Sequence, residues 1–293
     1  MSNICYFVHT CDDYQQFWNG WHVSFQKFWP KELDWNVYFV NEEIDCPYDD
    51  VTQIKTFKSK KEWIEETREV DSQGNPLPTK GSMKQFDHGW SDRLIMALDN
   101  IDEEYLLYVQ EDMWLKHLVD YDLFHNAFRF TERTDINVLR LTRLNILSSD
   151  KNFLHKTDHF VNDHRLLKID KKAGYLMNHQ PAIWKKSFLQ EVLVYGESFR
   201  DNEFEGTERI RQYDDPKIYH LNYDWCHGMP GAATAGKFHT YSFNQEWHEN
   251  VNDVCITKDL ELKREKYEPK SKGHKLSLVT SCFRAEKFLD ELS

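Results

Sequence analysis

Apolar residues near the N-terminus form two short runs separated by a helical stripe. Residues 4–10 and 35–40 are rich in Val, Ile, Phe and Tyr, the composition typical of strands, and a third short strand is predicted near residues 52–57. Between the first two runs, four aromatic residues recur at helical spacing: Phe17, Trp21, Phe25 and Phe28. This stripe predicts a helix over residues 14–29 that ends at Pro30. A strand, a helix and a strand in this order predict a right-handed crossover and a parallel sheet.

The strand signal in the middle of the chain stops on two carboxylates. Residues 105–109 are apolar at every position, which indicates a strand buried on both faces of a largely parallel sheet. The amphipathic residues 90–101 predict the helix before it. Ligands of open α/β sheets bind outside the carboxyl ends of the strands. Glu111 and Asp112 therefore predict a site for Mg²⁺ or Mn²⁺ carrying phosphate, with plain solvated acids as the alternative.

The rest of the pattern adds helices, strands and loops. Helices are predicted near residues 120–129, 184–193 and 205–213, a strand at 137–141, and short apolar segments at 166–169 and 175–177. A polar, His-rich stretch spans residues 148–164, and its histidines lack metal-ligand spacing. Residues 71–81 are rich in Gly and Pro, which predicts a surface loop, with a lid over the site as the alternative.

Composition narrows the class of protein. An apolar content of 40% and an aromatic content of 15% in 293 residues indicate a folded globule. The net charge of −12 would repel a nucleic-acid backbone, so a nucleic-acid partner is disfavoured. The six Cys form no C-x-x-C pair and follow no secretory segment, which indicates reduced thiols in a cytoplasmic protein. No apolar run reaches the roughly 20 residues that cross a bilayer.

The C-terminal quarter suggests a boundary between domains. After the flexible residues 228–236, Lys237 could hold a phosphate and His239 could complete a metal site. The charged residues 260–274 have the composition of a linker between a first domain, residues 1–259, and residues 275–293. The last segment reads as a strand running into a helix, so we expect it to be the truncated beginning of a following domain.

Six short motifs together resemble the nucleotide-sugar glycosyltransferases of the GT-A fold. In chain order they are Thr10-Cys11-Asp12-Asp13-Tyr14, Phe28-Trp29-Pro30, Gly89-Trp90-Ser91-Asp92-Arg93-Leu94, Gln110-Glu111-Asp112, Gln180-Pro181-Ala182-Ile183-Trp184 and Glu203-Phe204-Glu205-Gly206-Thr207. The resemblance covers about residues 4–237. It implies an α/β, Rossmann-like fold whose central sheet is mixed, mostly parallel and flanked by helices. Residues 277–289 resemble the opening of a family-two glycosyltransferase, with Arg284 where Asn is usual, which implies a fused transferase domain.

The resemblance implies a donor site for a UDP- or GDP-linked sugar. Thr10 and Asp12 would meet the nucleoside, although Asp12 could instead cap the following helix. Asp92 and Arg93 would meet the sugar or the diphosphate, with a surface ion pair as the alternative. Asp112 would hold Mn²⁺ or Mg²⁺ on the diphosphate.

The metal and the base follow from the same resemblance. Glu111 would contact the ribose or support the metal through water. The family's Asp-x-Asp appears here as Glu111-Asp112 followed by Met113. Inversion at the anomeric carbon needs a carboxylate base. Glu205 is the first candidate and Glu203 the second, expected on the same side of an extended segment, with acids of a helix start as the alternative. Trp184 would be a sugar-stacking wall or a core residue.

Three functions remain open at this point. The resemblance favours an inverting transfer of a sugar from a nucleotide-sugar donor to a hydroxyl of a glycan acceptor. A sugar-phosphate nucleotidyltransferase should carry a Gly-rich phosphate loop after the first strand, where this chain has Cys11-Asp12-Asp13-Tyr14. A non-catalytic carbohydrate-binding domain would keep aromatic walls without the chemistry.

Overall fold

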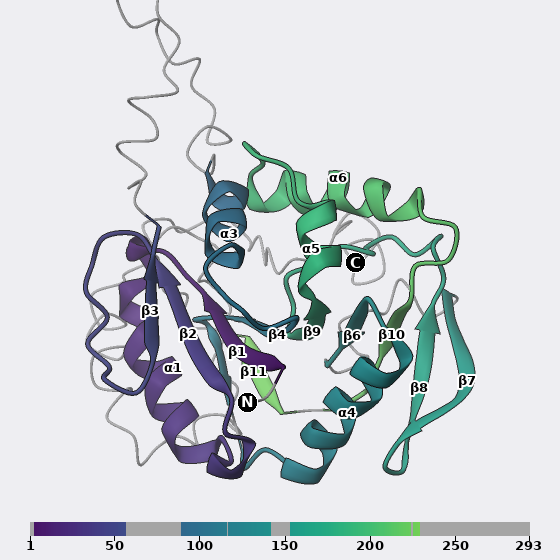
Figure 1. The fold of residues 1–293 in the computed structure, drawn as a ribbon, viewed down its shortest axis with the longest axis horizontal. Helices are drawn as coiled ribbons and strands as arrows, with labels where there is room; N and C mark the ends of the chain where they lie inside the picture. The colour runs from purple at the N-terminus through teal and green to yellow at the C-terminus, as the bar shows by residue number, and fades with distance from the viewer. Residues whose placement is uncertain (1–2, 57–88, 116, 142–152, 224, 229–293) are drawn as a thin grey trace, which may run out of the picture. The chain divides into compact units, whose positions relative to one another are not determined.

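A nine-stranded sheet with helices on both faces forms the described part of the chain (Figure 1). The computed structural model describes residues 3–56, 89–115, 117–141, 153–223 and 225–228. Within these residues the strand order is β3-β2-β1-β4-β9-β6-β10-β8-β7. Only β9 and β8 run against the other strands of this sheet. The prediction of an α/β fold with a central mixed, mostly parallel sheet is confirmed.

The N-terminal half of the sheet follows the predicted pattern closely. Its elements are β1 (Ile4–His9), the short η1 (Asp12–Tyr14), α1 (Gln15–Phe28), η2 (Lys31–Leu33), β2 (Asn36–Asn41), β3 (Thr52–Lys55), α3 (Trp90–Leu98) and β4 (Tyr105–Gln110). The strands β1 to β4 are parallel neighbours, as the strand-helix-strand order predicted. Their carboxyl ends therefore lie at one edge of the sheet.

The C-terminal half is where the sheet becomes mixed. Its elements are β5 (Met113–Leu115), α4 (Tyr121–Thr134), β6 (Val138–Arg140), β7 (Leu154–Val161), β8 (His164–Ile169), β9 (Ala182–Lys185), α5 (Lys186–Val192), α6 (Phe199–Arg211), β10 (Ile218–His220) and β11 (Cys226–Gly228). The strand β9 lies antiparallel between β4 and β6. A second, two-stranded sheet pairs β5 with β11. It carries the chain away from the end of β4.

Alternation along β1 separates two apolar layers. Cys5 and Phe7 face the side covered by α3 and α5, whereas Tyr6 packs its ring 5.0 Å from that of Phe25 on α1. On the same side, Trp29 contacts Phe124 of α4 with ring centroids 5.6 Å apart. Figure 1 shows α3, α5 and α6 on one side of the sheet and α1 and α4 on the other. Both faces of β1 are thus buried.

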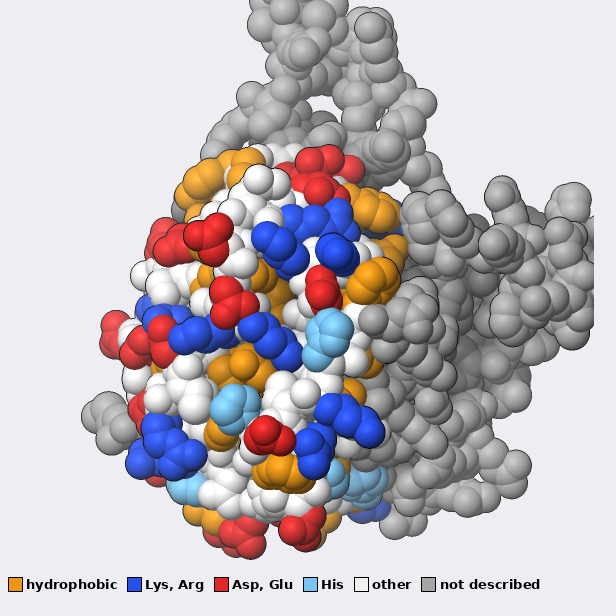
Figure 2. All heavy atoms as spheres, turned by 90° about the vertical axis from the view of Figure 1, so that its right-hand side faces the viewer, with side chains coloured by type: hydrophobic (Ala, Val, Ile, Leu, Met, Phe, Trp, Pro, Cys, Tyr) orange, Lys and Arg blue, Asp and Glu red, His pale blue; other side chains and the backbone are white. Residues whose placement is uncertain are grey.

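The surface at the β7 and β8 edge of the nine-stranded sheet carries charges of both signs. Figure 2 looks onto β7 and β8, where Lys and Arg side chains alternate with Asp and Glu. Arg165 lies 3.6 Å from Asp158, and His155 lies 3.1 Å from Asp170. Exposed ion pairs of this kind contribute up to about 1 kcal/mol each to the free energy of unfolding.

No helix among the described residues is long and apolar enough to cross a membrane.

Two sequence predictions of local structure are wrong. Trp184 does not begin a helix: it lies in β9, is 2% exposed, and pairs with Leu106 on one side and Val138 on the other. A central strand buried on both faces suits Ile183 and Trp184, and α5 begins only at Lys186. Of the two interpretations of Trp184, the core residue is the one that its burial supports.

The second wrong prediction concerns the last helix. We expected an extended segment through Glu203 and a helix from Glu205, but α6 already begins at Phe199. Ser198 caps it, because the Ser198 hydroxyl accepts a hydrogen bond from the Asp201 N–H at 3.2 Å. Glu203 and Glu205 therefore lie inside a helix, about 200° apart around its axis, and do not share a side.

Candidate functional site

The acidic pair occupies the whole connection between β4 and β5. Glu111 is buried, and Asp112 is partly buried with its Oδ1 enclosed and without a hydrogen-bond partner among the described residues. Burial raises the pKa of Glu111 well above its usual value, and the neighbouring Asp112 raises it further. Burial also raises the pKa of Asp112 to about 7. Burial and mutual repulsion therefore favour protonation of the pair, and a bound cation would favour ionisation.

Thr10 connects the end of β1 to this pair. Its hydroxyl accepts a hydrogen bond from the indole N–H of Trp18 at 2.9 Å. The Thr10 hydroxyl donates to the Cys11 carbonyl at 3.3 Å, and its interaction with Glu111 partly offsets the raised pKa of that carboxyl. Thr10 is 5% exposed, so its contacts in this structure are with its own chain.

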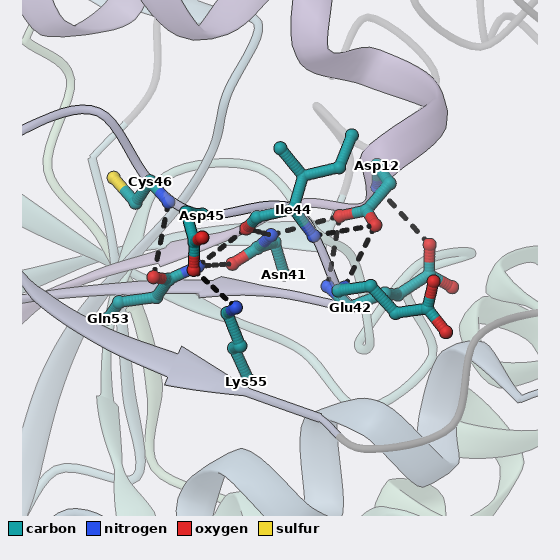
Figure 3. A network of polar contacts seen from close by, with 9 residues as sticks. Asp12, Asn41, Glu42, Ile44, Asp45, Cys46, Gln53 and Lys55 are labelled. Carbon is teal, nitrogen blue, oxygen red and sulfur yellow. Dashed lines mark hydrogen bonds and ion pairs between the residues drawn. The ribbon is translucent and has the colours of Figure 1, made fainter.

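Asp12 is bound by the loop that follows β2 (Figure 3). Its carboxylate accepts hydrogen bonds from the Asn41 amide at 2.9 Å and from three backbone N–H groups, those of Glu42 at 3.2 Å, Glu43 at 2.9 Å and Ile44 at 3.0 Å. Neither η1 nor α1 has a side-chain cap, so the prediction that Asp12 caps the following helix is wrong. In this structure Asp12 ties the carboxyl ends of β1 and β2 together.

The same loop is supported from β3. Gln53 donates from its amide to Asn41 Oδ1 at 2.7 Å and to the Ile44 carbonyl at 2.8 Å, and it accepts from the Cys46 N–H at 3.1 Å (Figure 3). Asn41 itself is fully buried. Three strand ends are thus joined by one hydrogen-bond network, which makes the loop a rigid wall beside β1.

Arg93 and Asp92 both hold other parts of the chain. Arg93 donates to Glu42 at 3.0 Å in an ion pair whose side chains are 13% and 7% exposed, so the pair exists but is not on the surface. The second oxygen of Glu42 accepts from the Asp12 N–H at 3.2 Å. Asp92 accepts from the Gly196 N–H at 2.8 Å, which joins α3 to the loop before α6.

Glu203 and Glu205 have opposite surroundings. Glu205 is exposed on the outer side of α6. Burial raises the pKa of Glu203 to about 7, although the His179 backbone N–H and the cations of Arg200 and Arg140 act in the other direction. The structure brings Glu203, the second candidate, toward the carboxyl edge of the sheet.

Tyr108 marks the place where the carboxylates meet. Its phenol is buried, and its pKa is raised well above the usual value by burial and then by Glu111, Asp112 and Glu203. The Tyr108 ring also lies 5.8 Å from that of His179, whose backbone N–H acts on Glu203, so the acidic pair and Glu203 both belong to the surroundings of this part of β4. The Tyr108 hydroxyl lies 3.1 Å from His9 Nδ1.

Neutral histidines complete this edge, and the sequence analysis did not single them out. Burial lowers the pKa of His9 well below its usual value, and Arg93 and His179 lower it further. Burial likewise lowers the pKa of His179 to about 3, and that of His220, with help from Arg140, to about 3. A signal was present for His9, because a polar residue ends an otherwise apolar strand. His179 and His220 had no pattern to reveal them.

The donor set fits a divalent cation only in part. No group of three His, Cys, Asp or Glu side chains among the described residues could hold a metal by itself. Asp112 Oδ1 is nevertheless a carboxylate oxygen without a partner in the described part of the chain, next to a second carboxylate, and Mg²⁺ and Mn²⁺ prefer such hard oxygen atoms. Cations of this kind usually take their other ligands from phosphate and water. Lys237 and His239, like the expected linker and following domain, lie outside the described residues.

Comparisons with known proteins gave matches in structure only. No protein-family model matches the sequence, and no curated protein matches it. Among solved structures, the chain is similar to S. aureus TarS 1-349, with a TM-score of 0.42, 12% identity, and coverage of 89% of this chain and 64% of that one. TarS 1-349 in complex with UDP-GlcNAc matches with a TM-score of 0.40 and 12% identity, over 89% of this chain and 65% of that one.

An archaeal structure matches to a similar degree. Mannosyltransferase PcManGT from Pyrobaculum calidifontis, in complex with GDP-Man and Mn²⁺, has a TM-score of 0.42 and 10% identity, over 90% of this chain and 73% of that one. The chain spans less than two thirds of the length of the two TarS structures given above.

Proposed function

We propose that this chain is a nucleotide-sugar glycosyltransferase of the GT-A type that transfers a sugar to a hydroxyl of a glycan acceptor with inversion. The observation that carries the proposal is the arrangement around Tyr108: the acidic pair directly follows its strand β4, and its ring lies 5.8 Å from that of His179, whose backbone N–H acts on Glu203. Such a transfer needs two separate anionic groups at one site: one that holds the leaving diphosphate through a cation, and one that takes a proton. The carboxyl edge of the sheet offers both.

Asp112 and Glu111 serve the donor in this proposal. Asp112, whose Oδ1 has no hydrogen-bond partner among the described residues, would hold Mn²⁺ or Mg²⁺. Burial and Asp112 raise the pKa of Glu111, and a cation bound beside it would favour its ionised form. The bound cation would neutralise charge on the leaving diphosphate. Thr10 keeps Glu111 in place, and the Asp12 network holds the loop 41–46 as the wall against which the nucleoside would lie.

Glu203 takes the place of Glu205 as the proposed base. A carboxylate with a pKa of about 7 holds a proton more strongly than an ordinary Glu but is still half ionised near neutral pH, which suits a general base. The Glu203 carboxylate would accept the proton of the acceptor hydroxyl while that oxygen bonds to the anomeric carbon. The bond from this carbon to the diphosphate oxygen breaks, and its electron pair leaves with the diphosphate.

The alternative functions have less support. A nucleotidyltransferase would need a phosphate-binding loop after β1, whereas here that segment carries Asp12, whose carboxylate is occupied by the loop 41–44. A carbohydrate-binding domain gives no reason for buried carboxylates with raised pKa values.

A two-stage experiment tests the proposal. Thermal shift with UDP-, GDP-, CMP- and dTDP-sugars, with and without Mn²⁺, should show a higher Tm for one donor class, because a ligand of the folded state stabilises it by mass action. Transfer, or slow donor hydrolysis, is then compared between Glu203→Gln and its matched control Glu205→Gln. We expect Glu203→Gln to lose activity by about 100-fold or more and Glu205→Gln to keep it.

The outcomes separate the parts of the proposal. If wild type neither binds nor hydrolyses any donor, the proposed function is wrong. If donor binds without turnover in wild type, the binding-domain alternative holds. If Glu205→Gln inactivates and Glu203→Gln does not, the assignment of the base is wrong.

A further inference from the structure

The turn formed by Glu111 and Asp112 is supported by α1, a helix that lies far from it in the sequence. Glu111 and Asp112 are the two residues between the end of β4 and the start of β5. The strand β4 is fixed in the large sheet, and β5 pairs with β11. The helix α1 also packs against β5. The geometry of the acidic pair therefore depends on how α1 holds β5.

Trp114 fixes the backbone of the pair. Its ring is fully buried, and its indole N–H donates to the Glu111 carbonyl at 2.9 Å. That carbonyl belongs to the planar peptide unit that joins Glu111 to Asp112. The hydrogen bond therefore sets the orientation of this peptide plane and, through it, the direction in which the Asp112 side chain leaves the backbone.

Gly20 lets the Trp114 ring reach the helix. A Cβ atom placed on Gly20 would overlap Cζ2, Cη2 and Cε2 of Trp114, far inside van der Waals contact. Gly20 lies in the middle of α1, a position where Gly destabilises a helix by about 1 kcal/mol relative to Ala. The absence of a side chain here is explained by the close approach of the ring.

Ser24 makes the second contact, one turn further along α1. Its hydroxyl accepts a hydrogen bond from the Leu115 N–H at 3.2 Å and donates to the Trp21 carbonyl at 2.8 Å. Trp18, on the same helix, donates to Thr10, which contacts Glu111 from the other side. The acidic pair is thus held through its backbone by β5 and through a side chain by β1, and α1 supports both.

We propose that α1 positions the acidic pair for the cation and diphosphate of the donor, with Trp114 and Ser24 as positioning residues. This inference rests on the proposed function, because it assigns these residues to the donor site of that reaction. Trp114 and Ser24 touch no reacting atom in this assignment. They keep the Glu111–Asp112 peptide in the orientation that lets Asp112 Oδ1 face a ligand.

A merely structural role makes a different prediction. If Trp114 only fills the core, its replacement lowers stability and leaves the Mn²⁺-dependent affinity for nucleotide unchanged in the folded protein. If it positions the acidic pair, affinity in the presence of Mn²⁺ falls, while the weaker affinity without metal changes little. Groups that orient metal ligands typically alter metal affinity by about 10- to 100-fold.

The test uses Trp114→Phe with a matched tryptophan as control. Trp225 is 1% exposed and also donates from its indole to a backbone carbonyl, that of Leu141, at 2.6 Å. Calorimetric titration measures the affinity of the full chain for UDP and GDP with and without Mn²⁺, and the Tm of each variant is recorded. We expect Trp114→Phe to weaken Mn²⁺-dependent binding by about 10-fold or more, and Trp225→Phe to change it less than about twofold at a similar loss of Tm.

Ser24→Ala keeps the test decisive if Trp114→Phe does not fold. It removes the acceptor of the Leu115 N–H and should weaken Mn²⁺-dependent binding by at least about threefold. The inference is overturned if the folded variants at Trp114 and Ser24 bind as wild type does, or if Trp225→Phe weakens binding equally. If wild type binds neither UDP nor GDP, the inference is overturned, whereas the proposed function fails only if the screen of all four nucleotide-sugar classes is negative as well.

Discussion

Replacement of Gly20 by Ala is the change for which the structure makes the sharpest energetic prediction. In an ordinary helix interior, Ala in place of Gly stabilises by about 1 kcal/mol. Here the new methyl group would overlap three ring atoms of Trp114. Overpacking of a close-packed core destabilises by about 1 to 3 kcal/mol. Displacement of the ring would also weaken its hydrogen bond to Glu111, worth about 0.5 to 1.5 kcal/mol. We expect a net loss of about 2 kcal/mol.

Gly20→Ala should stabilise the protein instead of destabilising it when the ring at position 114 is smaller. Phe has no Cζ2 or Cη2 atom, the two atoms of the Trp114 indole that would lie nearest to the added methyl group. In a Trp114→Phe background, Gly20→Ala should therefore stabilise by up to about 1 kcal/mol, the helix-propensity term alone. The two changes would then be coupled by about 3 kcal/mol, within the range seen for residues in direct contact.

Urea unfolding followed by circular dichroism measures the four free energies of this double-mutant cycle. Gly206→Ala in α6 is the control: its added Cβ would lie 2.9 Å from Cγ and 3.2 Å from Cβ of the buried Met177, a much milder overlap that the gain in helix propensity offsets. We expect that variant to change stability by less than about 1 kcal/mol. If Gly20→Ala and Trp114→Phe prove additive within about 0.5 kcal/mol, the close approach of ring and helix is refuted.

Three further predictions concern Glu203 and Asp12. Because the pKa of Glu203 is about 7, kcat/KM should fall about tenfold per pH unit below pH 7, and a flat profile from pH 5.5 to 8.5 would count against Glu203 as the base. The folded pKa of Glu203 lies above its usual 4.5, so its ionisation destabilises the fold as pH rises from 4.5 through 7. Glu203→Gln should thus raise stability at pH 8 by up to about 3 kcal/mol and leave it unchanged below pH 4.5, as urea unfolding at both pH values would show. Asp12→Ala removes the acceptor of four hydrogen bonds and should lower the free energy of unfolding by about 3 kcal/mol in the same assay. This loss is smaller than the sum for four bonds, because the freed N–H groups near Glu43 can bind water. An unchanged free energy would contradict the network.

Local pattern was sufficient where each element carried its own signal. Four elements lie close to their predicted bounds: the apolar strands β1 and β4, the helix α1 with its aromatic stripe, and the amphipathic helix α3. Burial on one or both faces requires apolar residues at regular spacing, and this spacing is visible in the sequence. The carboxyl edge of the sheet followed from the same pattern, because parallel strands end together. The position of Glu111 and Asp112 at that edge was predicted in this way.

Local pattern failed where a neighbour in space decides the structure. Ile183 and Trp184 are compatible with a helix or a strand, and only the gap between β4 and β6 makes them a strand. The start of α6 at Ser198 was missed, so Glu205 was preferred to Glu203. Burial of one Glu and exposure of the other depends on which side of α6 meets the sheet.

The sequence by itself determined the class of fold and the acidic end of its central strand, because hydrophobic periodicity and strand order are properties of consecutive residues. Only the tertiary structure decided which polar groups share a site. Glu203 raises the pKa of Tyr108 although nearly a hundred residues separate the two in sequence, and Gly20 accommodates the Trp114 ring at a similar separation. Desolvation, charge repulsion and close packing act through space, so the pKa values of these carboxylates and the need for a glycine in α1 become visible only when the chain is folded.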